Sequence, residues 1–392
     1  MQWLAALFLA LAGLCALRAE TVLVLPFFNQ ADSDNLSWIG ESISEAIQES
    51  LTASGLLTLE REDRLEAFRR LALRPNVVLT VASVMKAGEA LDASEVIYGH
   101  YEITAAGSAS AASKGTLRIT ARLLNLKQLR QGPEFEESGA LEDLALLEAR
   151  LSWQALGRLG AKSVPPEAEF LRARPRVRLD ALENYIRGLL ASSPELQNRF
   201  FTQAAHLDER YSQPCFQLGK SYWRKKDYRT AATWLRRVNR SDSRYMEAQF
   251  FLGLSDYYLG DYTGAVKCFE TVAGEVPLNE VYNDLGAAAL HCDARAAIEN
   301  FRKALDGDRT DPDYHFNLGY ALWRAGQFEA AAASFREVLT RNPNDSDAAA
   351  QLVRVTRRDA AGASGEVRER LKTEYEETAF RQLKAELESK KN

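Results

Sequence analysis

The chain has 392 residues, of which 46% are hydrophobic and 26% are charged, and its formal net charge is -5. This composition is typical of a globular protein with two or three domains, and it excludes a disordered chain and a protein embedded in a membrane. Because the net charge is slightly negative, we expect no general attraction to nucleic acid.

An apolar run without charged residues opens the sequence, from Trp3 to Leu17. The run is short for a membrane-spanning helix but suits the core of a secretory signal peptide, and Ala19 is a small residue where cleavage would occur. We therefore expect residues 1–19 to be an export signal and the protein to be periplasmic or exported. The alternative is an uncleaved inner-membrane anchor, in which case this segment alone contacts the membrane.

The next part of the chain, residues 21–162, predicts a mixed α/β domain. Its first segment is a β-branched run that ends at Pro26, as expected for a strand covered on both faces. A helix then follows, with Ile39, Ile43 and Ile47 on one stripe and Gly55 at its end. The later segments predict a short strand at 56–60, helices near 62–73 and 80–91, strands at 94–104 and 116–126 joined by a flexible loop, and a helix over about 141–159.

Residues 163–179 break this periodicity and predict an interdomain linker, because they hold three prolines and alternating arginines. The arginines at positions 172, 174, 176 and 178 are typical of a solvated linker. A small anion-binding strip is the alternative interpretation.

An internal repeat follows the linker. Four glycines, each preceded by a leucine, stand at intervals of 34, 33 and 33 residues: Gly219, Gly253, Gly286 and Gly319. A small residue lies on the second helix of each unit, at Ala231, Ala265, Ala297 and Ala331. Gly260 and Gly326 mark turns, and Pro277 and Pro343 end their units. In each unit we expect two helices to form a hairpin whose small residues let the backbones approach closely.

This period and these small residues resemble the tetratricopeptide (TPR) repeat. The resemblance is clear over 212–345, with a degenerate first unit at 181–211 and a closing helix at 347–358, so the expected array covers residues 180–358. The third unit is one residue short before Ala297, which predicts a shifted turn. The resemblance implies an α-solenoid after the α/β domain, and therefore a protein of the combined α/β and all-α class.

The α/β domain also resembles a known family, the domain related to the amino-terminal domain of TolB. The resemblance rests on the order of the elements and on short stretches such as "LPF" at 25–27 and "YGHY" at 98–101. It implies a domain used in assembly and interaction, without a catalytic residue set.

The last residues, 359–392, form a charged tail. Apolar residues with helical spacing give it a narrow strip, namely Val367, Leu371, Tyr375, Ala379, Leu383 and Leu387. The pattern predicts a solvent-facing helix that partly covers the end of the array. A coiled-coil or partner-binding segment is the alternative.

We find no constellation that points to catalysis, a cofactor or a metal. The four histidines (His100, His206, His291 and His315) are scattered without metal-binding spacing, and neither a Walker motif nor a GxSxG motif occurs. The cysteines at 215, 268 and 292 lack close partners, so we interpret them as small buried hydrophobes, with a disulfide or redox role as the alternative. We therefore expect a protein that is not an enzyme.

Binding remains, and the repeats suggest where it occurs. In a TPR array the first helix of each unit lines the concave groove. One stripe of these helices includes Asn283 and His291 in the third unit, and elsewhere it is rich in aromatic and basic residues. The predicted partner-groove residues are Phe216, Lys220, Trp223, Arg224, Phe250, Tyr257, Tyr258, Phe316, Tyr320, Trp323 and Arg324.

Within this stripe, Trp223, Tyr257, Tyr258, Tyr320 and Trp323 are expected to form a partly exposed aromatic wall, because such side chains dominate interface energies. The alternative for any one of them is packing between hairpins.

These observations favour a scaffold of the bacterial cell envelope that binds a protein or peptide segment in the groove. The alternative is a cytoplasmic or membrane-anchored signalling module whose α/β domain senses a small ligand. The oligomeric state is left open.

Overall fold

The computed structural model describes residues 21–30, 34–73, 78–104, 115–161, 164–174, 176–360 and 369–374, together with residues 383 and 387. The chain forms two compact units, Met1–Glu167 and Ala168–Asn392. Their boundary falls within the predicted linker. The expected export signal lies outside the described residues.

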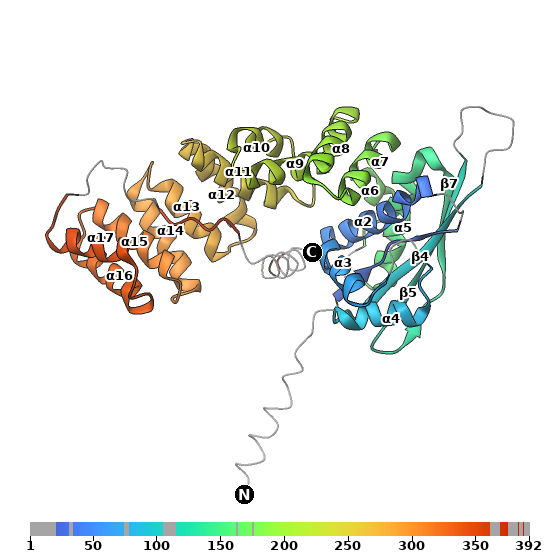
Figure 1. The fold of residues 1–392 in the computed structure, drawn as a ribbon, viewed down its shortest axis with the longest axis horizontal. Helices are drawn as coiled ribbons and strands as arrows, with labels where there is room; N and C mark the ends of the chain where they lie inside the picture. The colour runs from blue at the N-terminus through green and yellow to red at the C-terminus, as the bar shows by residue number, and fades with distance from the viewer. Residues whose placement is uncertain are drawn as a thin grey trace, which may run out of the picture. The chain divides into compact units, whose positions relative to one another are not determined.

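The first unit contains a seven-stranded mixed sheet (Figure 1). Strand β1 (Thr21–Val24) lies parallel to β3 (Leu57–Thr58) and to β4 (Glu95–Thr104), and β2 (Phe28–Asn29) also pairs with β4. Strand β5 (Thr116–Asn125) is antiparallel to β4, to β6 (Arg130–Gln131) and to β7 (Phe135–Ala140). The prediction of a mixed α/β domain is confirmed.

The helices of this unit are α2 (Trp38–Ala53), α3 (Arg61–Arg70), α4 (Val81–Ala90) and α5 (Leu144–Arg158), with short 3-10 turns at Asp34–Leu36 and Leu141–Asp143. Each α-helix lies where the sequence predicted one. Strands β2, β6 and β7 were not predicted. In β7 only Phe135 is buried, so the strand has no run of apolar residues that would reveal it.

Strand β1 is buried, as its continuous apolar run predicted. Leu23 and Leu25 pack with Phe68 of α3 and Val84 of α4 in one hydrophobic cluster. Because side chains alternate along a strand, Val22 and Val24 point to the opposite face. On that side the Ser44 hydroxyl of α2 donates a hydrogen bond to the backbone oxygen of Val24, at 3.3 Å.

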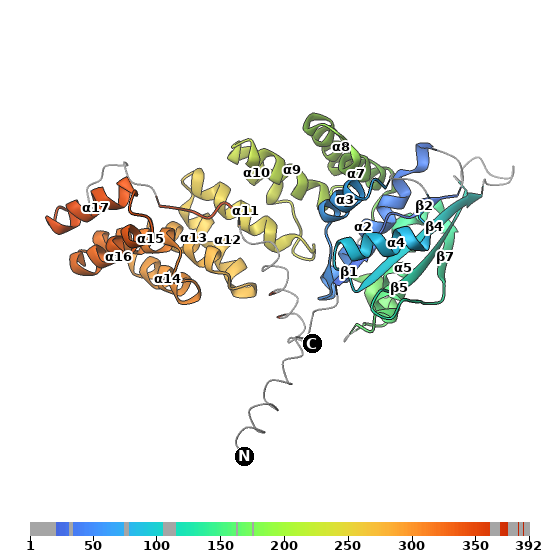
Figure 2. The same cartoon turned by 60° about the horizontal axis from the view of Figure 1, so that its bottom comes forward.

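The second unit is made of helices that follow one another as hairpins (Figure 2). After α6 (Glu167–Arg172), the pairs are α7 (Leu179–Leu190) with α8 (Pro194–Leu207), α9 (Gln213–Arg224) with α10 (Tyr228–Leu235), α11 (Tyr245–Tyr258) with α12 (Tyr262–Glu275), α13 (Asn279–Ala289) with α14 (Ala294–Gly307), and α15 (Pro312–Arg324) with α16 (Phe328–Arg341). Helix α17 (Ser346–Thr356) packs on α16 and closes the array. The predicted solenoid is confirmed.

The aligned glycines lie where the two helices of each hairpin meet. A Cβ atom on Gly286 would be 2.7 Å from the Phe301 ring, and one on Gly253 would be 2.9 Å from the Phe269 ring. Gly188 of α7 has the same role, because its Cβ atom would be 2.5 Å from the Phe201 ring. The degenerate first unit therefore keeps the close crossing that defines the others.

The turns between paired helices follow the sequence signals. Gly260 and Gly326 have φ angles of 81° and 74°, a region that favours glycine. In the third unit, α13 ends at Ala289 and α14 begins at Ala294. The turn thus spans residues 290–293, and the short unit keeps its hairpin by moving the turn, as expected.

Two expectations need correction. Cys215 and Cys268 are buried as predicted, but Cys292 is exposed because it lies in the turn before α14. The linker is not irregular throughout, since α6 forms within it and buries Phe170 under the Arg174 guanidinium, 3.3 Å from the ring centre.

Among the helices that the structure describes, none is long and apolar enough to span a membrane.

Candidate functional site

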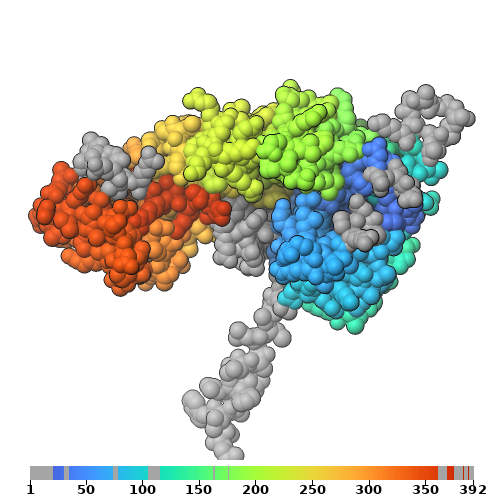
Figure 3. Space-filling view, viewed as in Figure 1, coloured from blue at the N-terminus to red at the C-terminus, as the bar shows by residue number. Residues whose placement is uncertain are grey.

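The clearest candidate site of the second unit holds a piece of the chain's own tail. Residues 369–374, here called the tail segment, are not helical, although the spacing of apolar residues predicted a helix. The segment lies across α13 in both ribbon views and forms a red band over the array in the space-filling view (Figure 3). The prediction of a helical tail is therefore wrong for these residues. Leu383 and Leu387 are helical, and Val367, Tyr375 and Ala379 lie outside the described residues.

Three buried polar side chains hold the backbone of the tail segment. Asn283 and Asn317 each donate a side-chain N–H to the backbone oxygen of Arg370, at 2.9 and 2.8 Å. The Arg370 N–H donates to Asn317 Oδ1 at 2.8 Å, and the Lys372 N–H donates to Asp284 Oδ1 at 2.8 Å. We call Asn283, Asp284 and Asn317 the amide clamp, because all three bind backbone amide groups of the tail segment. All three are fully buried, and these contacts read the main chain rather than a side chain.

The clamp residues also position one another. Asn317 Nδ2 lies 2.8 Å from Asn283 Oδ1, and Asn283 Nδ2 lies 3.0 Å from Asp284 Oδ1. Asp284 Oδ2 is buried and has no hydrogen-bond partner among the described residues. Burial raises the pKa of the Asp284 carboxyl well above its ordinary value, although the Lys372 N–H and the Asn283 amide act in the opposite direction.

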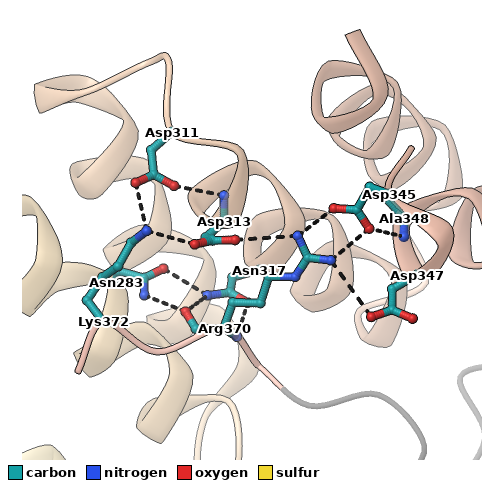
Figure 4. A network of polar contacts seen from close by, with 9 residues as sticks. All are labelled: Asn283, Asp311, Asp313, Asn317, Asp345, Asp347, Ala348, Arg370 and Lys372. Atoms are coloured by element: carbon teal, nitrogen blue, oxygen red, sulfur yellow. Dashed lines mark hydrogen bonds and ion pairs between the residues drawn. The ribbon is translucent and has the colours of Figure 1, made fainter. Parts of the chain in front are cut away.

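Four aspartates surround the two basic side chains of the tail segment (Figure 4). The Arg370 guanidinium donates to both carboxylate oxygens of Asp345, at 2.7 and 2.8 Å, and to Asp313 at 3.4 Å. It lies 4.0 Å from Asp347. The Lys372 ammonium lies 2.8 Å from Asp311 and 2.7 Å from Asp313. We call Asp311, Asp313, Asp345 and Asp347 the acidic rim.

The starts of two helices position the acidic rim. Asp311 is the N-cap of α15 and accepts a hydrogen bond from the Asp313 N–H. Asp345 is the N-cap of α17 and accepts one from the Ala348 N–H. A carboxylate is favoured at a helix N-terminus, so each N-cap hydrogen bond also fixes the orientation of its carboxylate. The ion-paired hydrogen bond from Arg370 lowers the pKa of Asp345 from its ordinary value.

The residues on either side of Arg370 make different contacts. The Tyr257 hydroxyl donates to Glu369 at 2.6 Å, and His291 Nε2 lies 3.3 Å from the same carboxylate. Burial raises the pKa of Glu369, but the contacts with His291 and Tyr257 outweigh it and the pKa is lowered overall. Leu371 packs against both hydrophobic clusters of the array. The Arg370 guanidinium also lies 3.7 Å from the centre of the Phe316 ring.

The predicted groove residues are divided between this site and the packing of the array. Tyr257 and Phe316 contact the tail segment. Phe216, Phe250 and Phe316 are buried, and the last two make edge-on contacts with phenylalanines of the paired helix. Phe250 and Phe316 therefore pack within their own hairpins, whereas the stated alternative was packing between hairpins.

The five residues of the expected aromatic wall differ in exposure. Trp323 is 4% exposed and its indole N–H donates to the backbone oxygen of Asp359 at 2.8 Å, so the expectation of partial exposure is wrong for this residue. Tyr257, Tyr320 and Trp223 are half-buried, and Trp223 packs against Phe251 with ring centres 5.1 Å apart. Tyr258 is exposed and stacks on Tyr228.

The basic members of the predicted stripe lie on the surface. Arg224 and Arg324 are exposed. Lys220 is half-buried, with its ammonium 5.5 Å from the ring centres of Phe216 and Phe251. That any of these residues contacts a partner remains a prediction.

Sequence reasoning placed Asn283 and His291 on the stripe but missed the rest of the amide clamp and the whole acidic rim. A signal was present, because Asn283 and Asn317, Asp311 and Asp345, and Asp313 and Asp347 are each 34 residues apart. Polar residues that recur with the repeat period fall on the same surface of successive units. The aspartates also stand at positions typical of helix N-caps, so the sequence does not reveal that they form ion pairs with the tail segment.

The described part of the chain contains no cluster of three or more histidine, cysteine or acidic side chains arranged to hold a metal ion. His100 lies in β4, opposite Thr120 of β5.

Comparisons with known proteins concern the helical unit. Residues 293–346, which include α14, α15 and α16, match the family model of the tetratricopeptide repeat. The TPR resemblance inferred from the repeat period is confirmed by this match. No curated protein matches the chain.

Among solved structures, the chain is similar to YrrB, described as a TPR protein with an unusual peptide-binding site. The identity is 18%, the match covers 44% of this chain and 91% of YrrB, and the TM-score is 0.42. It is also similar to MamA (41-end) from Desulfovibrio magneticus RS-1. The identity is 25%, the match covers 41% of this chain and 92% of the MamA chain, and the TM-score is 0.37.

Proposed function

We propose that the chain is a non-enzymatic scaffold for protein–protein interaction, and that its array receives an extended segment of a partner protein on the face formed by the amide clamp and the acidic rim. The observation that carries the proposal is the clamp itself. Asn283, Asp284 and Asn317 are fully buried, yet they direct hydrogen bonds to the main chain of residues 370 and 372.

Such an arrangement suits a binding site because every peptide has the groups that the clamp recognises. Residues i and i+2 of an extended chain point the same way, so a clamp spaced for 370 and 372 fits an extended backbone and not a helix. A buried amide without a hydrogen-bond partner costs about 1–3 kcal/mol, so Asn283 and Asn317 favour an occupant whose backbone supplies those partners.

A selection of peptides tests the proposal. A random displayed-peptide library is selected against the full chain carrying Arg370→Ala and Lys372→Ala, which weakens the tail segment and leaves the face unchanged. Selected peptides are then titrated into this variant with and without Asn317→Ala. We expect the additional substitution to weaken binding about tenfold or more, because it removes one donor and one acceptor for the peptide backbone.

The matched control is Asn342→Ala, which removes an exposed asparagine at the end of α16. It should leave binding unchanged, and circular dichroism checks that each variant is folded. If no selected peptide depends on Asn317, the proposal that this face binds a partner segment is wrong.

We further propose that the protein works in the cell envelope. The support is the uncharged apolar run from Trp3 to Leu17. Cell fractionation with N-terminal sequencing tests this: a cytosolic protein that still begins at Met1 would contradict export.

A further inference from the structure

We infer that the array selects an extended segment with the pattern acidic–Arg–apolar–Lys, and that the tail segment is a built-in occupant which a partner segment has to displace. This inference rests on the proposed function and names the chemistry of the partner. It follows from four features of the docked tail segment, which concern charge, apolar contact, conformation and an unfilled hydrogen bond.

The charges of the face require a basic occupant. Asp313 lies between the two cations of the tail segment, with one oxygen 3.4 Å from the Arg370 guanidinium and the other 2.7 Å from the Lys372 ammonium. Asp345 binds Arg370 through both oxygens, a geometry that arginine satisfies and lysine does not. Without these cations the carboxylates of the rim would repel one another. The face therefore distinguishes an arginine position from a lysine position two residues later.

The flanking positions are also specified. Leu371 contacts the two hydrophobic clusters that flank it, so the residue between the two cations has to be apolar. Glu369 is 9% exposed and meets the Tyr257 hydroxyl and His291, two groups that are able to donate a hydrogen bond. An acidic side chain fits before the arginine, whereas a third basic residue would leave its charge buried without a partner.

The conformation of the tail segment shows that the face imposes it. The apolar residues around it have helical spacing, and residues 383 and 387 are helical, but residues 369–374 are not. The hydrogen bonds to its backbone come from residues 53 to 88 positions away in the sequence. Within the described part of the chain, the hydrogen bonds to the backbone of this segment are made with distant side chains, as they would be for a separate ligand.

The tail segment does not use everything that the face offers. Asp284 Oδ2 is fully buried and has no hydrogen-bond partner among the residues that the structure describes. A partner segment with a polar group that reaches this oxygen would gain a hydrogen bond that the tail segment lacks. Such a hydrogen bond would offset part of the advantage that the tail segment has from being attached.

Peptide binding to the full chain tests the inference. The probe is a fluorescently labelled peptide with the sequence of residues 366–377, titrated into the wild type and into the full chain with Arg370→Ala and Lys372→Ala. We expect the peptide to bind the variant at least tenfold more tightly, because the apparent affinity falls by the fraction of molecules whose face is open. Peptides with Arg370→Ala or Lys372→Ala should bind the variant at least tenfold more weakly.

Hydrogen exchange provides a second readout that does not depend on the variant. In the wild type, the amides of residues 370 and 372 should be protected, and excess peptide should accelerate their exchange.

The control chain for the peptide titration carries Arg302→Ala and Arg336→Ala, which remove two exposed arginines of α14 and α16. This control should bind the peptide as weakly as the wild type does.

Three results would overturn the inference: equal affinity of the peptide for wild type and variant, rapid exchange at 370 and 372 in the free wild type, or no effect of the charge-removing changes in the peptide. If the library selection yields peptides that depend on Asn317 while the tail peptide fails to bind, the proposed function stands and this inference is wrong. If the selection yields none, the proposed function fails.

Discussion

At the scale of single residues, the most unusual group of the first unit is Glu148 of α5. Its side chain is 3% exposed, and Oε1 has no hydrogen-bond partner among the described residues. Burial, together with the nearby Glu49 carboxylate, raises its pKa to about 8. The folded state therefore favours the protonated carboxyl, whereas an unfolded chain ionises near the ordinary value of about 4.5.

Glu148→Gln should remove a pH dependence of stability. Because the folded pKa is the higher one, the stabilising effect of the proton is fully present below about pH 4.5 and is lost as the pH rises through about 8. The loss is on the order of 3–5 kcal/mol across that window. Relative to the wild type, the glutamine variant should become progressively more stable between pH 5 and pH 8.

Urea unfolding of the full chain at pH 5, 6.5 and 8 measures this effect. Glu136→Gln is the matched control, because Glu136 is exposed on β7 of the same unit. It should follow the wild type at every pH. A difference between Glu148→Gln and the wild type that is the same at pH 5 and pH 8 would show that Glu148 ionises normally in the folded protein.

At the scale of elements, the helical hairpins were predictable because their signals are local. Each pair of helices needs one close crossing, and the crossing needs a residue without a side chain, so the period of the glycines reveals the fold. Gly286 shows the constraint most clearly, since its missing Cβ atom would lie 2.7 Å from two atoms of the fully buried Phe301 ring. The hairpin is thus fixed by a contact that substitution can test.

Gly286→Ala should destabilise the array by about 1–3 kcal/mol, because the ring of Phe301 has no room to move away. The control is Gly274→Ala in α12, where a Cβ atom would meet nothing within 4 Å. There the change should stabilise the array by about 0.5–1 kcal/mol, since alanine favours the helix. Chemical denaturation of both variants checks the two opposite signs. Equal effects would mean that close packing at the crossing is not what the repeat glycines provide.

Two elements could not be predicted from the sequence, for different reasons. Strand β7 has one buried side chain, Phe135, and pairs with β5 at the edge of the sheet, so its pattern carries little information. The tail segment has a clear helical pattern that was misleading. A single surface helix is only marginally stable, and the hydrogen bonds that the backbone of the tail segment makes with Asn283, Asp284 and Asn317 stabilise the non-helical form instead. Those bonds depend on the folded array.

At the scale of the whole chain, the candidate site is built from residues that lie far apart in the sequence. Its parts are common residues in ordinary roles, such as the N-caps Asp311 and Asp345, and only the assembled array brings them together with Arg370. The recurrence of these polar residues every 34 positions can be recognised in the sequence, but the sequence does not show that the tail segment binds to them. The aromatic and basic stripe chosen from residue type lies partly inside the array, because large aromatic side chains serve packing as well as recognition.

Attachment of the tail segment has a consequence for assembly. Residues 361–368 connect the end of the array to the tail segment, and a short connection gives an attached ligand an effective concentration on the order of millimolar. At micromolar protein concentration the segment of the same chain therefore outcompetes that of a second copy by about a thousandfold. We expect exchange of tail segments between copies to be negligible.

Sedimentation velocity of the full chain from about 1 to 100 µM tests this expectation, since these concentrations lie well below the effective concentration of the attached segment. The wild type should sediment as a single species with the mass of one chain, 43.7 kDa for all 392 residues. The variant with Arg370→Ala and Lys372→Ala should behave identically, because its tail segment no longer competes for any copy. A mass that rises with concentration in the wild type, but not in this variant, would mean that the tail segment docks on a neighbouring chain. The 34-residue recurrence of the clamp and rim would then serve self-assembly, with Arg370 of one copy bound to Asp345 of the next.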